Sequence, residues 1–142
     1  MKPVSELLRT RSATVRRVAP NENVFNALRL LADFEVGALV VMEGDTLVGI
    51  FSERDYTRKI ALQGKSSKDT PVSEIMTRNV FTVGPSTRTR ECMSLMSQKK
   101  IRHLPVVDGN KVLAMISIRD IMDDIIADHE ITIAQLQNDI QS

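Results

Sequence analysis

Apolar residues in the first half of the chain follow first a helical and then a strand pattern. A helical spacing of apolar residues follows Asn21, a residue type typical of helix N-caps, and we expect Gly37 to stop this helix. Its apolar face consists of Val24, Ala27, Leu28, Leu31 and Phe34. Two apolar runs of strand length follow at residues 38–42 and 47–51, with Gly44 in the turn between them. These runs predict a β-hairpin.

The same succession of patterns occurs a second time. A strand at 15–18 precedes the first helix, and another helix starts near Ser52 and fades toward Gly64, so the block has the order β-α-β-β-α. In the second block the pattern predicts strands at 80–83, 104–107 and 112–116, with helices at 86–100 and from Ser117. The sequence therefore predicts an α/β protein.

The two blocks are also similar residue by residue. Shifting the chain by 65 residues aligns 18–56 with 83–121 without a gap, and residues 4–8 match 72–76 at a shift of 68. We therefore expect two tandem repeats, 4–64 and 72–124, packed as a pseudo-two-fold pair. Residues 65–71 form the predicted linker, and 125–142 form a C-terminal helical extension.

Composition narrows the class of protein. With 142 residues, 42% hydrophobic and 26% charged, the chain can bury a core and should be globular and soluble. A net charge of +1 argues against a nucleic-acid binder, and no apolar run suggests a membrane span or a secretory signal. We expect a cytoplasmic location. The single cysteine, Cys92, lies on an apolar helix face and is expected to be a buried hydrophobe.

The repeated Ser-x-x-Asp motif is the strongest candidate for chemistry. Ser52 and Asp55 in the first repeat correspond to Ser117 and Asp120 in the second, each pair following an apolar strand. The first turn of a helix has unpaired N–H groups and attracts anions such as phosphate. The same spacing is also that of a capping box, which needs no ligand. The duplication favours a ligand, but both interpretations stay open here.

Other site chemistry is not indicated. The two histidines, His103 and His129, fall on different predicted elements, so a metal site is not expected. The sequence shows no Ser/His/Asp or Cys/His arrangement and no glycine-rich phosphate loop. We therefore predict that the protein is not an enzyme.

The C-terminal helix carries an apolar stripe at heptad spacing. Its members are Ile126, His129, Ile133, Leu136 and Ile140. The stripe is shorter than three heptads, so packing on its own domain is one interpretation. We favour contact between subunits, because the repeats can fill a core without it.

The β-α-β-β-α repeats, the paired Ser-x-x-Asp motifs and the segment from Ile101 to Asp108 resemble the cystathionine-β-synthase (CBS) domain. Two such domains form a Bateman module, and the resemblance covers about residues 4–123. It implies a stand-alone regulatory module with no catalytic activity. Such a module binds AMP, ADP, ATP, S-adenosylmethionine or NAD between its repeats, signals to a regulated partner that the sequence does not identify, and commonly forms homodimers. The alternative is a scaffold that dimerises without a ligand.

The resemblance also assigns roles to residues. Asp55 and Asp120 would accept hydrogen bonds from ribose hydroxyls, an acceptor-only role that suits a carboxylate. The remaining assignments are phosphate or ribose contact for Ser52 and Ser117, base contact for Ile50 and Met115, and further charge from Arg54 and Arg119.

Each cleft would be completed by the opposite repeat. The resemblance implies that Arg102 and His103 complete the Ser52/Asp55 cleft, whereas Gly37 and Ala38 complete the other. The first cleft should then prefer the more anionic nucleotide, because Arg102 is charged and His103 can be. A plain solvated role for the arginines, or a polar helix exit at 102–103, remains the competing interpretation. Ala114, at a position that is usually glycine, is expected to narrow the second cleft.

Overall fold

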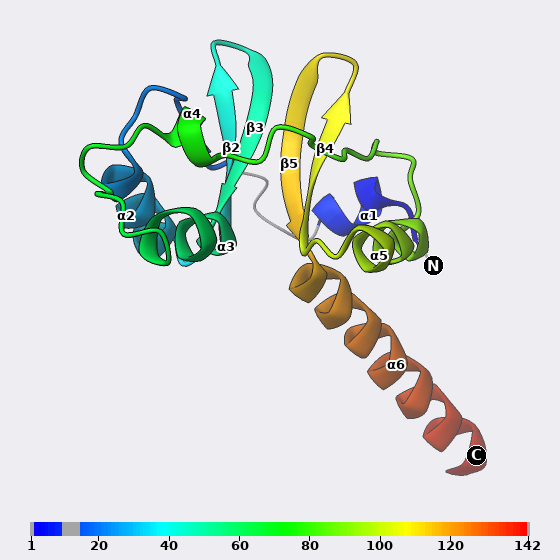
Figure 1. Ribbon diagram of the computed structural model, residues 1–142. Coiled ribbons are helices and arrows are strands. Elements are labelled where there is room, and N and C mark those ends of the chain that lie inside the picture. The colour runs from blue at the N-terminus through cyan, green and yellow to red at the C-terminus, as the bar shows by residue number, and fades with distance from the viewer. Residues whose placement is uncertain (1, 10–14, 142) are drawn as a thin grey trace.

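Two β-hairpins stand side by side at the centre of the molecule, and helices flank them on the outside (Figure 1). The computed structural model describes residues 2–9 and 15–141. The hairpins are β2 (Ala38–Glu43) with β3 (Thr46–Ser52), and β4 (His103–Asp108) with β5 (Lys111–Ser117). Their registers match at the 65-residue offset, since Ala38 pairs with Ser52 and His103 with Ser117. The predicted tandem α/β repeat is therefore confirmed.

The helices largely follow the predicted pattern. Their bounds are α1 (Val4–Arg9), α2 (Val24–Phe34), α3 (Glu53–Tyr56), the π-helical turn η1 (Thr57–Ala61), α4 (Val72–Ile75), α5 (Thr89–Lys99) and α6 (Ile118–Gln141).

Both predicted ends of the first long helix are wrong. The N-cap of α2 is Asn23 rather than Asn21, because the Asn23 side chain accepts the Asn26 N–H at 2.8 Å. At its other end Glu35, not Gly37, takes the left-handed conformation, with φ 54°.

The first strand of each repeat is shorter than predicted. In the first repeat only β1 (Arg17–Val18) forms, parallel to β2. In the second, the strand predicted at 80–83 shrinks to one parallel bridge between Val83 and Val106. The helix expected from Ser86 starts at Thr89, because a turn closes first: the Thr87 N–H donates to the Gly84 carbonyl at 3.1 Å.

The two short lead-in helices exchange places between the repeats. Val4 and Leu7 of α1 are buried in the core built by β4, β5 and α5 of the second repeat. Val72 and Ile75 of α4 are buried in the core of the first repeat instead. Each core thus contains a segment that precedes the other repeat in the chain, and this exchange ties the two halves together.

Cys92 lies in the second core with none of its surface exposed. Its counterpart Ala27 is equally buried in the first core. Burial raises the pKa of the Cys92 thiol to about 11. The interpretation of this cysteine as a buried hydrophobe is therefore confirmed.

The long C-terminal helix is also confirmed. Among its described side chains, those that join the second core are Ile118, Ile121 and Ile125, in the first two turns. Beyond them α6 projects away from both repeats (Figure 1). Within residues 2–9 and 15–141, no helix has the length and apolarity needed to span a membrane.

Candidate ligand-binding site between the repeats

The two Ser-x-x-Asp motifs lie where β3 runs into α3 and β5 runs into α6. Both form reciprocal capping boxes. Asp55 accepts the Ser52 N–H at 3.0 Å while Ser52 Oγ accepts the Asp55 N–H at 3.2 Å. In the second repeat, Asp120 accepts the Ser117 N–H at 2.8 Å and Ser117 Oγ accepts the Asp120 N–H at 3.1 Å. The capping function predicted for the motif is therefore present in both repeats.

Asp55 is also held by the connection from η1 to α5, residues 62–88, which is longer than the predicted linker 65–71 and is called the linker from here on. Its Oδ1 accepts hydrogen bonds from Thr77 Oγ1 at 3.0 Å and from Lys59 Nζ at 3.1 Å. Lys59 in turn donates to the carbonyl of Ile75 at 2.9 Å. The Asp55 side chain is only 7% exposed. This carboxylate is thus a buried junction between the start of α3 and the linker.

Asp120 has different surroundings. It is half-buried, and the position that matches Lys59 is occupied by Asp124. Asp124 forms an ion pair with Lys2 at 2.8 Å, next to α1. Where the first repeat has a lysine, the second therefore has a carboxylate. That carboxylate pairs with Lys2, just before α1.

Two contacts cross from one repeat to the other near these motifs. Arg54 donates from Nη1 to the carbonyl of Lys100 at 2.8 Å, and Lys100 is the C-cap of α5. A cation at this end of a helix complements the helix dipole. Arg54 therefore has a structural contact in addition to any role toward a ligand.

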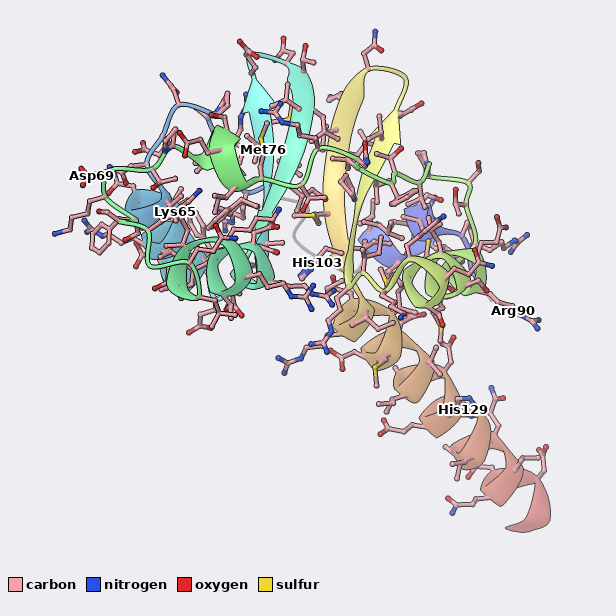
Figure 2. All side chains as sticks on the ribbon, in the orientation of Figure 1. Lys65, Asp69, Met76, Arg90, His103 and His129 are labelled. Atoms are coloured by element: carbon pink, nitrogen blue, oxygen red, sulfur yellow. The ribbon has the colours of Figure 1, made fainter. Side chains whose placement is uncertain are left out.

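The second contact joins His103 to Gly37. A Cβ atom added to Gly37 would lie 3.3 Å from His103 Cε1, so glycine leaves room for the imidazole ring. Figure 2 shows His103 between the repeats, close to the starts of α3 and α6. This close approach, rather than a helix stop, explains glycine at position 37.

The backbone places each strand start beside the motif of its own repeat. The Glu53 N–H donates to the Gly37 carbonyl at 3.1 Å, and the Ile118 N–H donates to the Arg102 carbonyl at 2.9 Å. Of the residues Gly37, Ala38, Arg102 and His103, the structure shows Gly37 and His103 in contact across the repeats, with each other. Which cleft Gly37, Ala38, Arg102 and His103 complete therefore stays a prediction.

The predicted site residues differ in exposure. Ala38 and Asp55 are buried; Gly37, Ile50, Ser52, His103, Met115, Ser117 and Asp120 are half-buried; and Arg54, Arg102 and Arg119 are exposed.

The prediction that His103 can supply positive charge needs a correction. Burial lowers the pKa of His103 from its usual 6.5, and Arg102 lowers it further, whereas Asp120 acts in the opposite direction. The imidazole is therefore neutral near pH 7. Arg102 is left as the permanent cation on this strand start.

Ala114 also has a different role from the one expected. It is 4% exposed and lies in the second core, so its methyl group packs there. Glycine at the matching position 49 is required by another contact. A Cβ atom there would approach the Met76 sulfur to 2.7 Å. The two repeats therefore differ at this position because Met76 of the linker packs against Gly49, whereas the methyl group of Ala114 fits in the second core.

Lys59 and Thr77 are functional candidates that the sequence did not single out. Lys59 had a visible signal, since it stands four residues after Asp55, a spacing that brings helical side chains together. Thr77 had none, because its contact depends on the path of the linker. That path is fixed by two backbone bonds between Thr77 and Ile50, at 3.0 and 2.8 Å.

Two hollows lie elsewhere on the surface. One, of about 760 Å³, runs along α5 and includes Arg90, Glu91 and Gln98. The other, of about 540 Å³, lies between the hairpin turns and includes Asp45 and Lys111. Neither is lined by a Ser-x-x-Asp residue. Within the described part of the chain, no cluster of three or more His, Cys, Asp or Glu side chains could hold a metal ion.

Comparisons with known proteins agree with the repeat. The sequence model of the CBS domain matches residues 4–62 and again 72–127. A mitochondrial CBS domain-containing protein of Arabidopsis thaliana, CBSX3, is 39% identical over 126 residues, which cover 85% of this chain. The match spans 61% of the length of CBSX3.

Solved structures give the same result. A protein with CBS domains from Burkholderia ambifaria MC40-6 is 45% identical, with a TM-score of 0.87 over 89% of this chain and 96% of the other. The CBS domain pair of protein MJ0100, solved with 5′-methylthioadenosine and S-adenosyl-L-methionine, has a TM-score of 0.79 over 90% of this chain and 98% of that one. At 24% identity the MJ0100 likeness shows the fold alone. From the family match and these relatives, this chain belongs to the CBS domain family, a non-catalytic family, and carries two CBS domains in tandem.

Proposed function

We propose that this chain is a regulatory module that binds an adenine nucleotide, AMP, ADP, ATP or NAD, between its two CBS domains. One observation carries the proposal: two helix starts with the same Ser-x-x-Asp motif lie near the contact between the repeats, where His103 meets Gly37. A carboxylate offers only acceptors, which suits the two ribose hydroxyls. The adenosyl ligands of MJ0100, which shares this fold, support the ligand class.

The Ser117/Asp120 cleft is the stronger of the two in this proposal. Asp120 is half-buried, whereas Asp55 is buried and already accepts bonds from Thr77 and Lys59. The helix that follows also differs. α6 has 24 residues, but α3 has four before it turns into η1. A longer helix presents a stronger positive end to a bound phosphate.

The Ser52/Asp55 cleft is proposed to bind with a conformational cost. A ribose hydroxyl can approach Asp55 Oδ1 only by replacing the Thr77 hydroxyl or the Lys59 ammonium group. Either replacement loosens the linker where Lys59 holds the Ile75 carbonyl. This offers a route by which an occupied cleft changes the linker and signals to a regulated partner. We further propose that the module acts as a homodimer.

A thermal-shift panel with AMP, ADP, ATP, NAD and S-adenosylmethionine tests this function. A ligand that binds only the folded state raises the melting temperature. At a concentration of 100 times its Kd, it adds about 2.7 kcal/mol to the free energy of unfolding. Asp120→Ala should remove most of the shift, whereas Asp108→Ala, an exposed carboxylate at a hairpin turn, should leave it unchanged. A panel in which no compound stabilises the wild type contradicts nucleotide binding.

A ligand-independent scaffold is the second candidate. The observation in its favour is that both Ser-x-x-Asp motifs are complete capping boxes, so their sequence is accounted for without a ligand. The same panel separates the two functions, since a scaffold gives no shift with any nucleotide.

A further inference from the structure

The exposed half of α6 presents apolar side chains that nothing in the described part of the chain covers. Ile126, Ile133 and Leu136 are 52%, 55% and 57% exposed, and Met122 is 51% exposed. The side chains that α6 gives to the second core are Ile118, Ile121 and Ile125, all N-terminal to Ile126. From there to Gln141 the helix rises about 24 Å, at 1.5 Å per residue. Large apolar side chains at this exposure indicate an interaction surface.

The spacing of these residues is that of a coiled coil. Ile126 and Ile133 take a positions, and Met122, His129 and Leu136 take d positions. His129 is exposed and lies on the projecting part of α6 (Figure 2). In the sequence, Ile140 occupies the next a position of the heptad. A partner for this stripe is therefore another helix that matches a 3.5-residue repeat.

Charge along α6 decides how a second copy can pair with it. One of the 19 basic and six of the 18 acidic residues lie in this helix, so it carries −5 and the rest of the chain +6. Asp120, Asp124 and Asp128 take b, f and c positions, which point away from a coiled-coil seam. Their mutual repulsion across a pair is weakened by salt, since the Debye length at 0.15 M is about 8 Å.

The acidic residues beside the seam favour one direction. In a parallel pair each g position faces the next e position of the other helix, which sets Ile125 against Glu130. In the antiparallel pair that matches the whole stripe, Glu130 faces Glu130 of the other copy. Like charges placed in this way are destabilising. The charge pattern therefore selects the parallel arrangement.

We propose that α6 pairs in parallel and in register with α6 of a second copy, through Met122, Ile126, His129, Ile133 and Leu136. The inference rests on the proposed homodimer and not on nucleotide binding. Because α6 begins directly after Ser117, a parallel pair places the two Ser117/Asp120 clefts of the dimer at the same end of the coil. Ligand at one cleft can then alter how the second copy is held.

Disulfide trapping in the full chain tests both the partner and the direction. Leu136→Cys puts a thiol at a d position, where parallel in-register helices bring it opposite its own copy. Asp128→Cys is the matched control, because position c faces outward. The native Cys92 is fully buried, with the pKa of its thiol raised to about 11, and so stays silent. We expect an intermolecular disulfide in Leu136→Cys only. Equal trapping of both variants, or trapping only in a mixture of Leu136→Cys with Ile126→Cys, overturns the parallel pair.

Sedimentation separates failure of this inference from failure of the homodimer. Ile133→Asp should weaken self-association at least tenfold, and His129→Leu should strengthen it, because leucine is favoured at d. Raising salt from 0.05 to 0.5 M should strengthen it as well, since like charges are screened. A dimer unaffected by Ile133→Asp overturns the α6 pair but keeps the homodimer. A monomeric wild type overturns both.

Discussion

The two helix starts have the same motif, yet their carboxylates have different neighbours. Asp55 is buried and accepts bonds from Ser52, Lys59 and Thr77. Asp120 is half-buried and shares its capping box with Ser117. Four residues further on, the first repeat has a lysine that binds its carboxylate, and the second has Asp124 bound to Lys2. A motif that is repeated in sequence can therefore hold a buried carboxylate in one copy and a half-buried carboxylate in the other.

The largest expected effect is on stability. Asp55→Ala removes an acceptor shared by a capping box, a lysine and a threonine, and should lower the free energy of unfolding by about 2 to 3 kcal/mol. Asp120→Ala removes its capping contribution and should cost about 1 kcal/mol. Urea unfolding of both variants measures the difference. Equal losses would mean that the Lys59 and Thr77 bonds contribute little.

A double change can open the first cleft. Lys59→Met with Thr77→Val removes both donors from Asp55 Oδ1 while keeping similar side-chain shapes. We expect this variant to bind nucleotide at the Ser52/Asp55 cleft more tightly than the wild type, so that calorimetry shows a second equivalent that the wild type takes up only weakly. Arg58→Met, an exposed neighbour, is the control and should bind as the wild type does. If the double variant keeps the wild-type stoichiometry, the lysine and threonine do not close the cleft.

A smaller effect concerns pH. The lowered pKa of His103 means that the unfolded chain takes up this proton at a higher pH than the folded chain. The contribution of neutral His103 to the free energy of unfolding is therefore intact above about pH 6.5. This contribution is lost as pH falls from there toward the pKa of His103 in the folded chain. His103→Gln should reduce the loss of stability between pH 7.5 and pH 5.5, measured by urea unfolding. A His103 variant whose pH dependence matches the wild type would contradict the assignment.

The smallest effect should come from Arg102. Its side chain is exposed, so a charge contact with phosphate is worth up to about 1 kcal/mol, or roughly fivefold in affinity. In the Lys59→Met, Thr77→Val background, adding Arg102→Ala should weaken ATP at the Ser52/Asp55 cleft more than AMP. The difference should vanish at high salt. Equal effects on the two nucleotides would exclude contact between Arg102 and the additional phosphates.

Much of the fold could be predicted from the sequence because the two hairpins and the long helix have strong local patterns. Residues 38–42 and 47–51 are continuous apolar runs around a glycine turn, and they form β2 and β3. The exchange of α1 and α4 could not be predicted. Their similar short sequences do not encode which core each helix joins, because that depends on the path of the connections.

The candidate site was predicted only in part. The motif located Asp55 and Asp120, and the i,i+4 spacing of Lys59 held the information that separates them. Thr77 lies 22 residues from Asp55 and reaches it through the linker, so no local pattern connects the two. The neutral state of His103 also depends on burial, which a two-residue polar segment does not reveal.

Calorimetric titration of Asp55→Asn and Asp120→Asn with the nucleotide that stabilises the wild type tests the central claim most directly. Asparagine keeps the side-chain shape at each position and removes the charge. The account predicts that Asp120→Asn loses most of the binding heat, whereas Asp55→Asn binds with nearly wild-type affinity and stoichiometry. Loss of binding in Asp55→Asn, with normal binding in Asp120→Asn, would contradict it.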